Sequence, residues 1–198
     1  MADRYTNFAA LAASERSGVD YRYWLKDRGT AIVVLAPHGG WIEPGTSEIA
    51  EAIAHEDYSI YAFEGLRRRP HGALHITSTL FDEPEGLRLV SGAETAIAIH
   101  GREDDDDSTT VWLGGRDIAL RGAIASSLKS AGFEMVPAPP GMAALNPANI
   151  CNRGTSRGGV QLELPLTLRN QLIEDTAMLQ LFASAVRKAI SSNRGQPQ

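Results

Sequence analysis

The chain has 198 residues, of which 43% are hydrophobic and 22% are charged. This length and composition suit one domain with a sizeable core, spanning 1–198, and leave too little chain for two. The single cysteine, Cys151, excludes an internal disulfide and a zinc site with several thiolates, so a metal would need histidine and carboxylate ligands. The net charge of -5 argues against nucleic acid as a partner, because a phosphate backbone is bound by clustered Lys and Arg.

No stretch approaches the roughly eighteen uninterrupted apolar residues of a membrane span. Residues 1–18 are too polar for the apolar core of a secretory signal. We therefore expect a cytoplasmic protein without a membrane partner, and we expect it to be a monomer.

Strand and helix patterns alternate along the first half of the chain. In order, the sequence predicts a helical start, an edge strand at 21–25, a buried strand at 31–36, a helix at 47–55 capped by Thr46, strands at 59–63 and 74–77, and a short helix at 84–90. The buried strand leads into a loop that begins at Pro37.

The second half continues this alternation. It predicts strands at 95–100 and 109–113 that pair as a hairpin across a solvated acidic tip at 103–107, a helix at 117–131, strands at 133–136 and 159–164, a helix at 174–191 and a disordered tail at 193–198. The ordered loop at 137–157 has the length and composition usually kept for function. We expect a three-layer α/β sandwich whose mixed, largely parallel sheet has helices on both faces.

Three residues could converge on a metal at the carboxyl ends of the predicted strands, where α/β proteins place their chemistry. His38 and Glu43 share the segment PHGGWIEPGT, whose glycines let the backbone fold both side chains toward one point. His100 ends a neighbouring strand and is followed by glycine. Zinc sites in enzymes use three such ligands and one water. The alternatives are an ordinary loop histidine, a surface carboxylate and a strand-end histidine.

Glu163 is a candidate general base. Alternation in the strand VQLEL places it on one face with Gln161, and its leucine neighbours would partly desolvate the carboxylate. A strand-end glutamate in an ion pair is the alternative.

Several separated motifs resemble the poly-γ-glutamate hydrolase family, once labelled phage-related replication proteins and similar in fold to zinc carboxypeptidases. They are PHGGWIEPGTSEIA, YAFEG, LHITSTLFDEP, AIAIHG, LNPANICNRG and GVQLELP. The resemblance implies one zinc held by His38, Glu43 and His100, with Glu163 as the base. Zinc carboxypeptidases begin with HxxE, whereas this chain has HxxxxE, so the detailed ligand geometry does not carry over.

Substrate contacts are predicted in two places. Arg153 and Arg157 precede the catalytic strand, and a guanidinium can bind a carboxylate or steady an oxyanion, so Arg153 is also a catalytic candidate. Asn152 lies beside them and His75 in the segment LHITST, where it could equally be a core histidine. Arg67, Arg68, Arg69 and His71 form a basic patch that could guide a polyanion.

The expected reaction is zinc-dependent hydrolysis of γ-glutamyl amide bonds, in poly-γ-glutamate or in a smaller γ-linked substrate. A related hypothesis is an amidohydrolase of small N-acyl amino acids. The third is a noncatalytic phage replication accessory protein, which would bind DNA without a metal.

Overall fold

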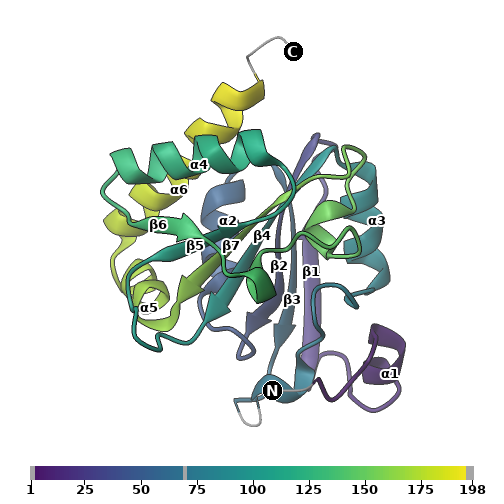
Figure 1. Ribbon diagram of the computed structural model, residues 1–198. Coiled ribbons are helices and arrows are strands. Elements are labelled where there is room, and N and C mark those ends of the chain that lie inside the picture. Colours follow the sequence, from purple (N-terminus) through teal and green to yellow (C-terminus); the bar gives the residue numbers. More distant parts are fainter. Residues whose placement is uncertain (1–2, 69–70, 195–198) are drawn as a thin grey trace.

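Seven strands form one sheet in the computed structural model, which describes residues 3–68 and 71–194 (Figure 1). From edge to edge the order is β1 (Tyr21–Lys26), β3 (Ser59–Gly65), β2 (Ile32–Gly40), β4 (Thr95–Arg102), β7 (Val160–Pro165), β5 (Val111–Gly114) and β6 (Met135–Pro137). The four central strands β3, β2, β4 and β7 are parallel, whereas β1 is antiparallel to β3 and β5 is antiparallel to β7. The mixed, largely parallel sheet is confirmed.

Helices cover both faces of this sheet. One face carries α2 (Thr46–Ala54), α4 (Ile118–Ser130), α5 (Leu166–Glu174) and α6 (Thr176–Arg194). The other carries α1 (Phe8–Ala12), α3 (Pro84–Gly92) and the short 3-10 helices η1 (His71–Leu74), η2 (Pro140–Met142) and η3 (Ile150–Asn152). None of the helices in the described ranges has the length and apolarity needed to cross a membrane.

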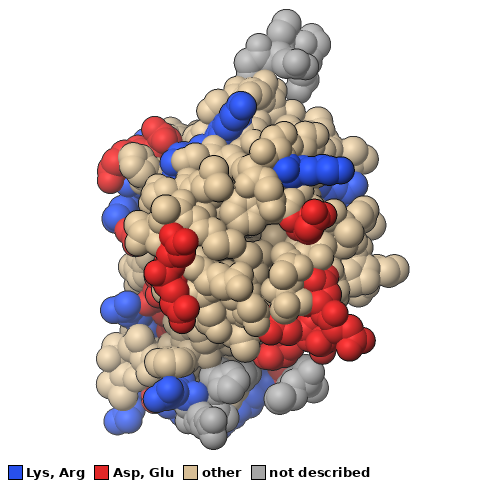
Figure 2. Space-filling model, turned by 90° about the vertical axis from the view of Figure 1, so that its left-hand side faces the viewer, with Lys and Arg blue, Asp and Glu red and all other residues tan. Residues whose placement is uncertain are grey.

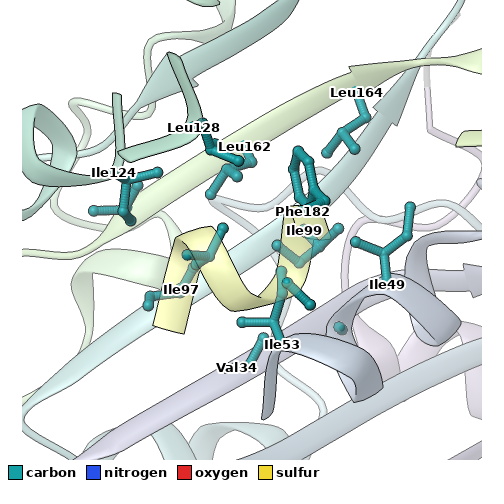
Figure 3. Close-up of a cluster of buried hydrophobic side chains, with 14 of the residues drawn as sticks. Val34, Ile49, Ile53, Ile97, Ile99, Ile124, Leu128, Leu162, Leu164 and Phe182 are labelled. Carbon is teal, nitrogen blue, oxygen red and sulfur yellow. The ribbon is translucent and has the colours of Figure 1, made fainter. Parts of the chain in front are cut away.

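A large apolar cluster fixes the central strands against α2, α4 and α6 (Figure 3). Alternate residues of β4 and β7, such as Ile97, Ile99 and Leu162, are fully buried there, and Phe182 of α6 packs edge-on against Phe133 at 5.0 Å. Burying each such side chain contributes about 1.5–3 kcal/mol. Because this cluster holds β2, β4 and β7 side by side, it also fixes where their carboxyl ends lie.

The structure corrects several details of the sequence prediction. The segments 95–100 and 109–113 do not pair as a hairpin, because β7 lies between β4 and β5. Thr46 is not the cap of α2, because Gly45 holds that position at φ 90° and the Thr46 hydroxyl donates to the carbonyl of Glu43. Residues 74–77 are not a strand; η1 ends at Leu74 and an irregular segment follows. Asn193 belongs to α6, and 195–198 lie outside the described residues.

Candidate metal centre

The strand β2 runs on through the first part of the histidine loop before the chain turns back. Its pairing with β3 shifts between Ala36 and Gly39. A Cβ on Gly39 would lie 2.0 Å from the Ser47 hydroxyl, so only glycine fits there. Gly40 then adopts φ 62°, and the amide of Glu43 donates to the carbonyl of His38 at 2.8 Å. This tight turn places Glu43 beside His38.

Three side chains converge at the end of β2 and β4. The Nδ1 atom of His38 lies 2.9 Å from Oε1 of Glu43 and 3.1 Å from Nδ1 of His100. The same His100 nitrogen is 3.5 Å from Oε2 of Glu43. Both histidines are buried, and the amide of Gly101 donates to Oε2 of Glu43 at 2.8 Å. The three residues predicted to bind a metal are therefore neighbours.

The second ring nitrogen of each histidine already has a partner. The Nε2 atom of His38 lies 2.8 Å from the carbonyl of Ile76, which can only accept, so this nitrogen carries the proton. The Nε2 atom of His100 is 3.2 Å from the hydroxyl of Ser78. In a neutral His38 ring, Nδ1 then presents a lone pair to His100 and to the carboxylate of Glu43. Such partners on the outer nitrogen are typical of metal-binding histidines.

The spacing of the donor atoms, which are two ring nitrogens and the two oxygens of Glu43, fits a tetrahedral metal. Zinc binds nitrogen and oxygen at about 2.0–2.2 Å, which puts neighbouring tetrahedral ligand atoms about 3.3 Å apart. The distances of 2.9, 3.1 and 3.5 Å bracket that value. A cation between the donors would also remove the repulsion between lone pairs. The chemistry and the spacing of the donor set therefore fit a zinc ion.

The electrostatics keep Glu43 ready to bind a cation. Burial favours the neutral acid, but the positive charge and the N–H donors that His38 and His100 supply in their protonated forms outweigh it and lower the pKa of Glu43 strongly. Burial likewise opposes charge on His100, and the contacts with Glu43 overcome it and raise the pKa of that ring. A metal ligand must be deprotonated, which the low pKa of Glu43 ensures.

His75 lies against this group from the segment after η1. Its ring centroid is 4.0 Å from that of His38, and its Nδ1 lies 2.6 Å from Oδ1 of Asp3. Ligand atoms of His38, Glu43 and His75 also lie within 4.8 Å of one another, so His75 forms a second three-residue group with the same pair. The shorter distances favour His100 as the third ligand. Burial lowers the pKa of His75 to about 4, so it stays neutral near pH 7.

Glu163 is placed beside the donor group by strand pairing. It is the register partner of His100 across β4 and β7, and only 7% of its surface is exposed. Its Oε1 accepts a 2.6 Å hydrogen bond from Nε2 of Gln161. Burial raises the pKa of Glu163 despite the nearby charge of His100. Glu163 is thus a direct neighbour of His100 in the sheet, and its carboxylate is bound by Gln161.

Arg153 ties loops together. Its guanidinium donates to the carbonyls of Ala148, Phe81 and Thr79 at 2.8, 3.3 and 3.1 Å. The amide of Asn152 donates to two carbonyls of its own loop. Three of the five N–H donors of Arg153 and both donors of the Asn152 side chain are therefore used within the protein.

Residues 152–157 lie at the amino ends of the central strands. Oδ1 of Asn152 accepts from Gly159, just before β7, and Thr155 donates to the carbonyl of Ala93, just before β4. The six residues from Thr95 to His100 span about 16 Å. The structure therefore does not bring Asn152 and Arg157 to the metal donors, and their role in substrate binding stays a prediction. Arg157 instead lines an open hollow with Arg116 and Arg153.

Arg169 is a residue of the site that the sequence did not indicate. It is 2% exposed, and its guanidinium donates to the carbonyls of Leu164, Pro44 and Arg102. It therefore joins the ends of β7 and β4 to the loop that carries Glu43. A Cβ on Gly101 would lie 2.4 Å from this guanidinium. The glycine after His100 is the one sequence signal of this close approach.

Histidine and carboxylate donors at the carboxyl edge of a largely parallel sheet give an α/β protein with a candidate metal site of the kind that hydrolases use. The solved N-acetylmuramoyl-L-alanine amidase AmiC2 of Nostoc punctiforme shares this fold, with a TM-score of 0.51 and 15% identity over 83% of this chain and 97% of that chain. The sequence profile of the poly-γ-glutamate hydrolase family matches residues 5–189, and the chain belongs to this family. The resemblance stated from the motifs is confirmed.

Individual relatives agree with this assignment. The SPbeta prophage-derived protein YoqZ of Bacillus subtilis is 40% identical over 173 residues, which are 86% of this chain and 62% of YoqZ. Protein YndL of the same organism is 38% identical over 172 residues, 86% of this chain and 67% of YndL. This chain thus spans somewhat less than two thirds of the length of YoqZ.

Two solved structures cover nearly the whole chain. A bacteriophage poly-γ-glutamate hydrolase has a TM-score of 0.93 and 32% identity over 98% of this chain and 99% of that chain. A zinc-free structure of YndL has a TM-score of 0.87 and 32% identity over 96% and 98%. These matches support a hydrolytic enzyme over the noncatalytic alternative.

Proposed function

We propose that this protein is a zinc-dependent hydrolase that cleaves γ-glutamyl amide bonds, with poly-γ-glutamate as the substrate and one zinc ion per chain. The observation that carries the proposal is the convergence of His38, Glu43 and His100 with donor atoms 2.9–3.5 Å apart. Family membership supports the choice of substrate class.

In this proposal His38, Glu43 and His100 hold the metal and Glu163 moves the proton. Zinc, when bound, would lower the pKa of a water molecule and polarise the scissile carbonyl. Glu163 accepts the proton of the attacking water and delivers it to the leaving amine. Burial supports this role, since a carboxylate with a raised pKa is a stronger base and accepts the proton of the attacking water more readily than an ordinary glutamate. His75 stays neutral and packs against the ligand His38.

An exposed pair next to the metal loop suits an anionic substrate. Trp41 lies in the loop between His38 and Glu43 and is 41% exposed, and the guanidinium of Arg68 lies 5.0 Å from its ring centroid. Within the described residues Arg68 forms no ion pair, whereas Arg67 binds Glu15 and Asp20. Arg68 is therefore available to a substrate carboxylate.

The surface at this end carries both signs of charge. Figure 2 shows acidic as well as basic side chains at the lower end of the molecule, the end at which β2 and β3 finish in Figure 1. A poly-γ-glutamate chain carries one free α-carboxylate per residue, so it would be attracted there to individual basic side chains such as Arg68.

The test is metal-dependent digestion of the polymer. Zinc content of the purified protein is measured by mass spectrometry, and the sizes of poly-γ-glutamate products are followed before chelation, after chelation and after zinc is returned. We expect one zinc per chain, polymer shortening that chelation stops, and recovery with zinc. α-Linked polyglutamate is the matched control. Cleavage of small N-acyl amino acids with the polymer untouched would refute the proposed substrate.

A further inference from the structure

Two buried amide side chains lead from the candidate base into the loop above the sheet. Gln161 and Asn149 are 4% and 5% exposed. Nε2 of Gln161 donates to Oε1 of Glu163 at 2.6 Å, and Oε1 of Gln161 accepts from Nδ2 of Asn149 at 3.1 Å. A continuous series of hydrogen bonds therefore joins Glu163 to the loop that follows η2.

Backbone groups fix the direction of this series. Oδ1 of Asn149 accepts from the amide of Cys151 at 3.1 Å, which can only donate, so the amino group of Asn149 must face Gln161. The oxygen of Gln161 then faces Asn149, and its amino group faces Glu163. The same amino group lies 3.4 Å from the carbonyl of Met142. Reversing the Gln161 amide would set its oxygen against two acceptors, so a single orientation remains.

This arrangement acts on one oxygen of the carboxylate. A hydrogen bond to an ionised carboxylate is shorter and stronger than one between neutral groups, and the 2.6 Å contact fits that description. It restrains rotation of the Glu163 side chain. Among the described residues, no hydrogen bond to Oε2 of Glu163 is found, which leaves that oxygen able to accept a proton.

We propose that Gln161 is a positioning residue that orients Glu163 for proton transfer, with its own amide orientation set by Asn149 and the backbone of Cys151. The inference rests on the proposed function in one respect, the role of Glu163 as the base. It adds a functional role for Gln161, which lies on the same face of β7 as Glu163. It also assigns Asn149 and the backbone of Cys151 the role of holding Gln161 in place.

Gln161→Met is the direct test, because methionine has a similar length but no donor. Misplacing a catalytic group by about 1 Å costs up to 10²-fold in rate, so we expect kcat to fall about 10- to 100-fold. KM and zinc content should stay unchanged, since neither substrate binding nor the ligands are touched. Gln171→Met, an exposed glutamine of α5, is the matched control and should keep wild-type kcat.

A double variant separates positioning from a general structural effect. In a Glu163→Gln protein there is no base left to orient, so adding Gln161→Met should not lower the residual turnover further. A further loss of the same size would overturn the inference. If Gln161→Met does not fold, Asn149→Ala replaces it, since it removes the donor to Oε1 of Gln161 and loosens that side chain; full kcat in that variant would also overturn the inference.

The same variants distinguish this inference from the proposed function. Wild-type turnover in Glu163→Gln would show that Glu163 is not the base. It would refute the proposed mechanism and the positioning role of Gln161 together. Loss of turnover in Glu163→Gln together with wild-type kcat in Gln161→Met would refute only the positioning role of Gln161.

Discussion

His38 and His100 face each other with their Nδ1 atoms 3.1 Å apart, and neither ring is free to turn away. The outer nitrogen of His38 is held by the carbonyl of Ile76, and that of His100 by the hydroxyl of Ser78. The pair is thus preorganised for a cation, because the ring positions that bind a metal are already set before it arrives.

Removing either histidine should empty the centre. We expect His38→Ala and His100→Ala each to weaken zinc affinity by more than about 100-fold, the upper loss seen when only an outer partner is removed. Competition with a zinc-binding dye measures this affinity. His55→Ala serves as the control, because His55 is exposed at the end of α2. Full zinc occupancy in His38→Ala would show that the ligands are other residues.

Replacing the base should separate chemistry from metal binding. Glu163→Gln keeps the shape of the side chain but cannot accept a proton, so kcat should fall by roughly 10²–10⁴-fold while zinc stays bound. In the wild-type enzyme the base works only when ionised, so activity is lost as the pH falls through its pKa. Because burial raises the pKa of Glu163, that loss should begin at a higher pH than for an ordinary glutamate. Loss of zinc in Glu163→Gln would instead make Glu163 a ligand.

Arg169 should matter for both folding and metal binding. Arg169→Ala leaves the buried carbonyls of Leu164, Pro44 and Arg102 without a donor, so the free energy of unfolding should drop by about 2–4 kcal/mol. Zinc affinity should weaken as well, since Pro44 adjoins Glu43. Lysine cannot reach three carbonyls in one plane, so Arg169→Lys should recover only part of the loss. Urea unfolding with and without zinc measures both effects, and an unchanged midpoint would refute this role.

The buried histidine beside the ligands predicts a pH dependence of stability. The folded protein lowers the pKa of His75 to about 4 from its usual 6.5, so the unfolded chain binds the proton more tightly. This contribution to stability is fully present above pH 6.5 and is lost as the pH falls toward 4. Urea unfolding of the zinc-free protein at pH 7 and pH 5 should therefore show a smaller decrease for His75→Asn than for wild type. Equal decreases would contradict the shift.

Arg68 should affect the polymer more than the chemistry. Arg68→Gln is expected to raise KM for poly-γ-glutamate by roughly two- to fivefold, the scale of one exposed ionic contact, with kcat unchanged. The difference between the two proteins should shrink at high salt, where such contacts are screened. Arg88→Gln, on the exposed side of α3, is the control. Identical KM values would show that Arg68 does not contact the substrate.

Much of the fold could be predicted because hydrophobic periodicity is local. The buried strand before Pro37, the helix capped by Asp117 and the strand that holds Glu163 follow from short windows of sequence. The pairing of β5 with β7 could not, since it joins segments far apart in the chain. The predicted hairpin failed for that reason, because sequence neighbours were assumed to be spatial neighbours.

The site was predictable to the same extent. Glycine spacing and strand ends indicated His38, Glu43 and His100, whose approach the structure shows. The contact of His75 with Asp3 bridges 72 residues and leaves no local pattern. Arg153 was selected because it precedes β7 along the chain, and its contacts with the carbonyls of Thr79 and Phe81, more than 70 residues away, could not be predicted from a local pattern.

The position of β7 constrains the order in which the protein can assemble. It follows β5 and β6 in sequence but lies between them and β4. The half-sheet of β1, β3, β2 and β4 can form first. The three candidate metal ligands, His38, Glu43 and His100, can come together at the same stage. β5 and β6 pair with each other but cannot join the half-sheet until residues 160–165 insert between them and β4, a non-local step of the kind that slows folding. The group of metal ligands can therefore form without β7, whereas Glu163 arrives only when that strand enters the sheet.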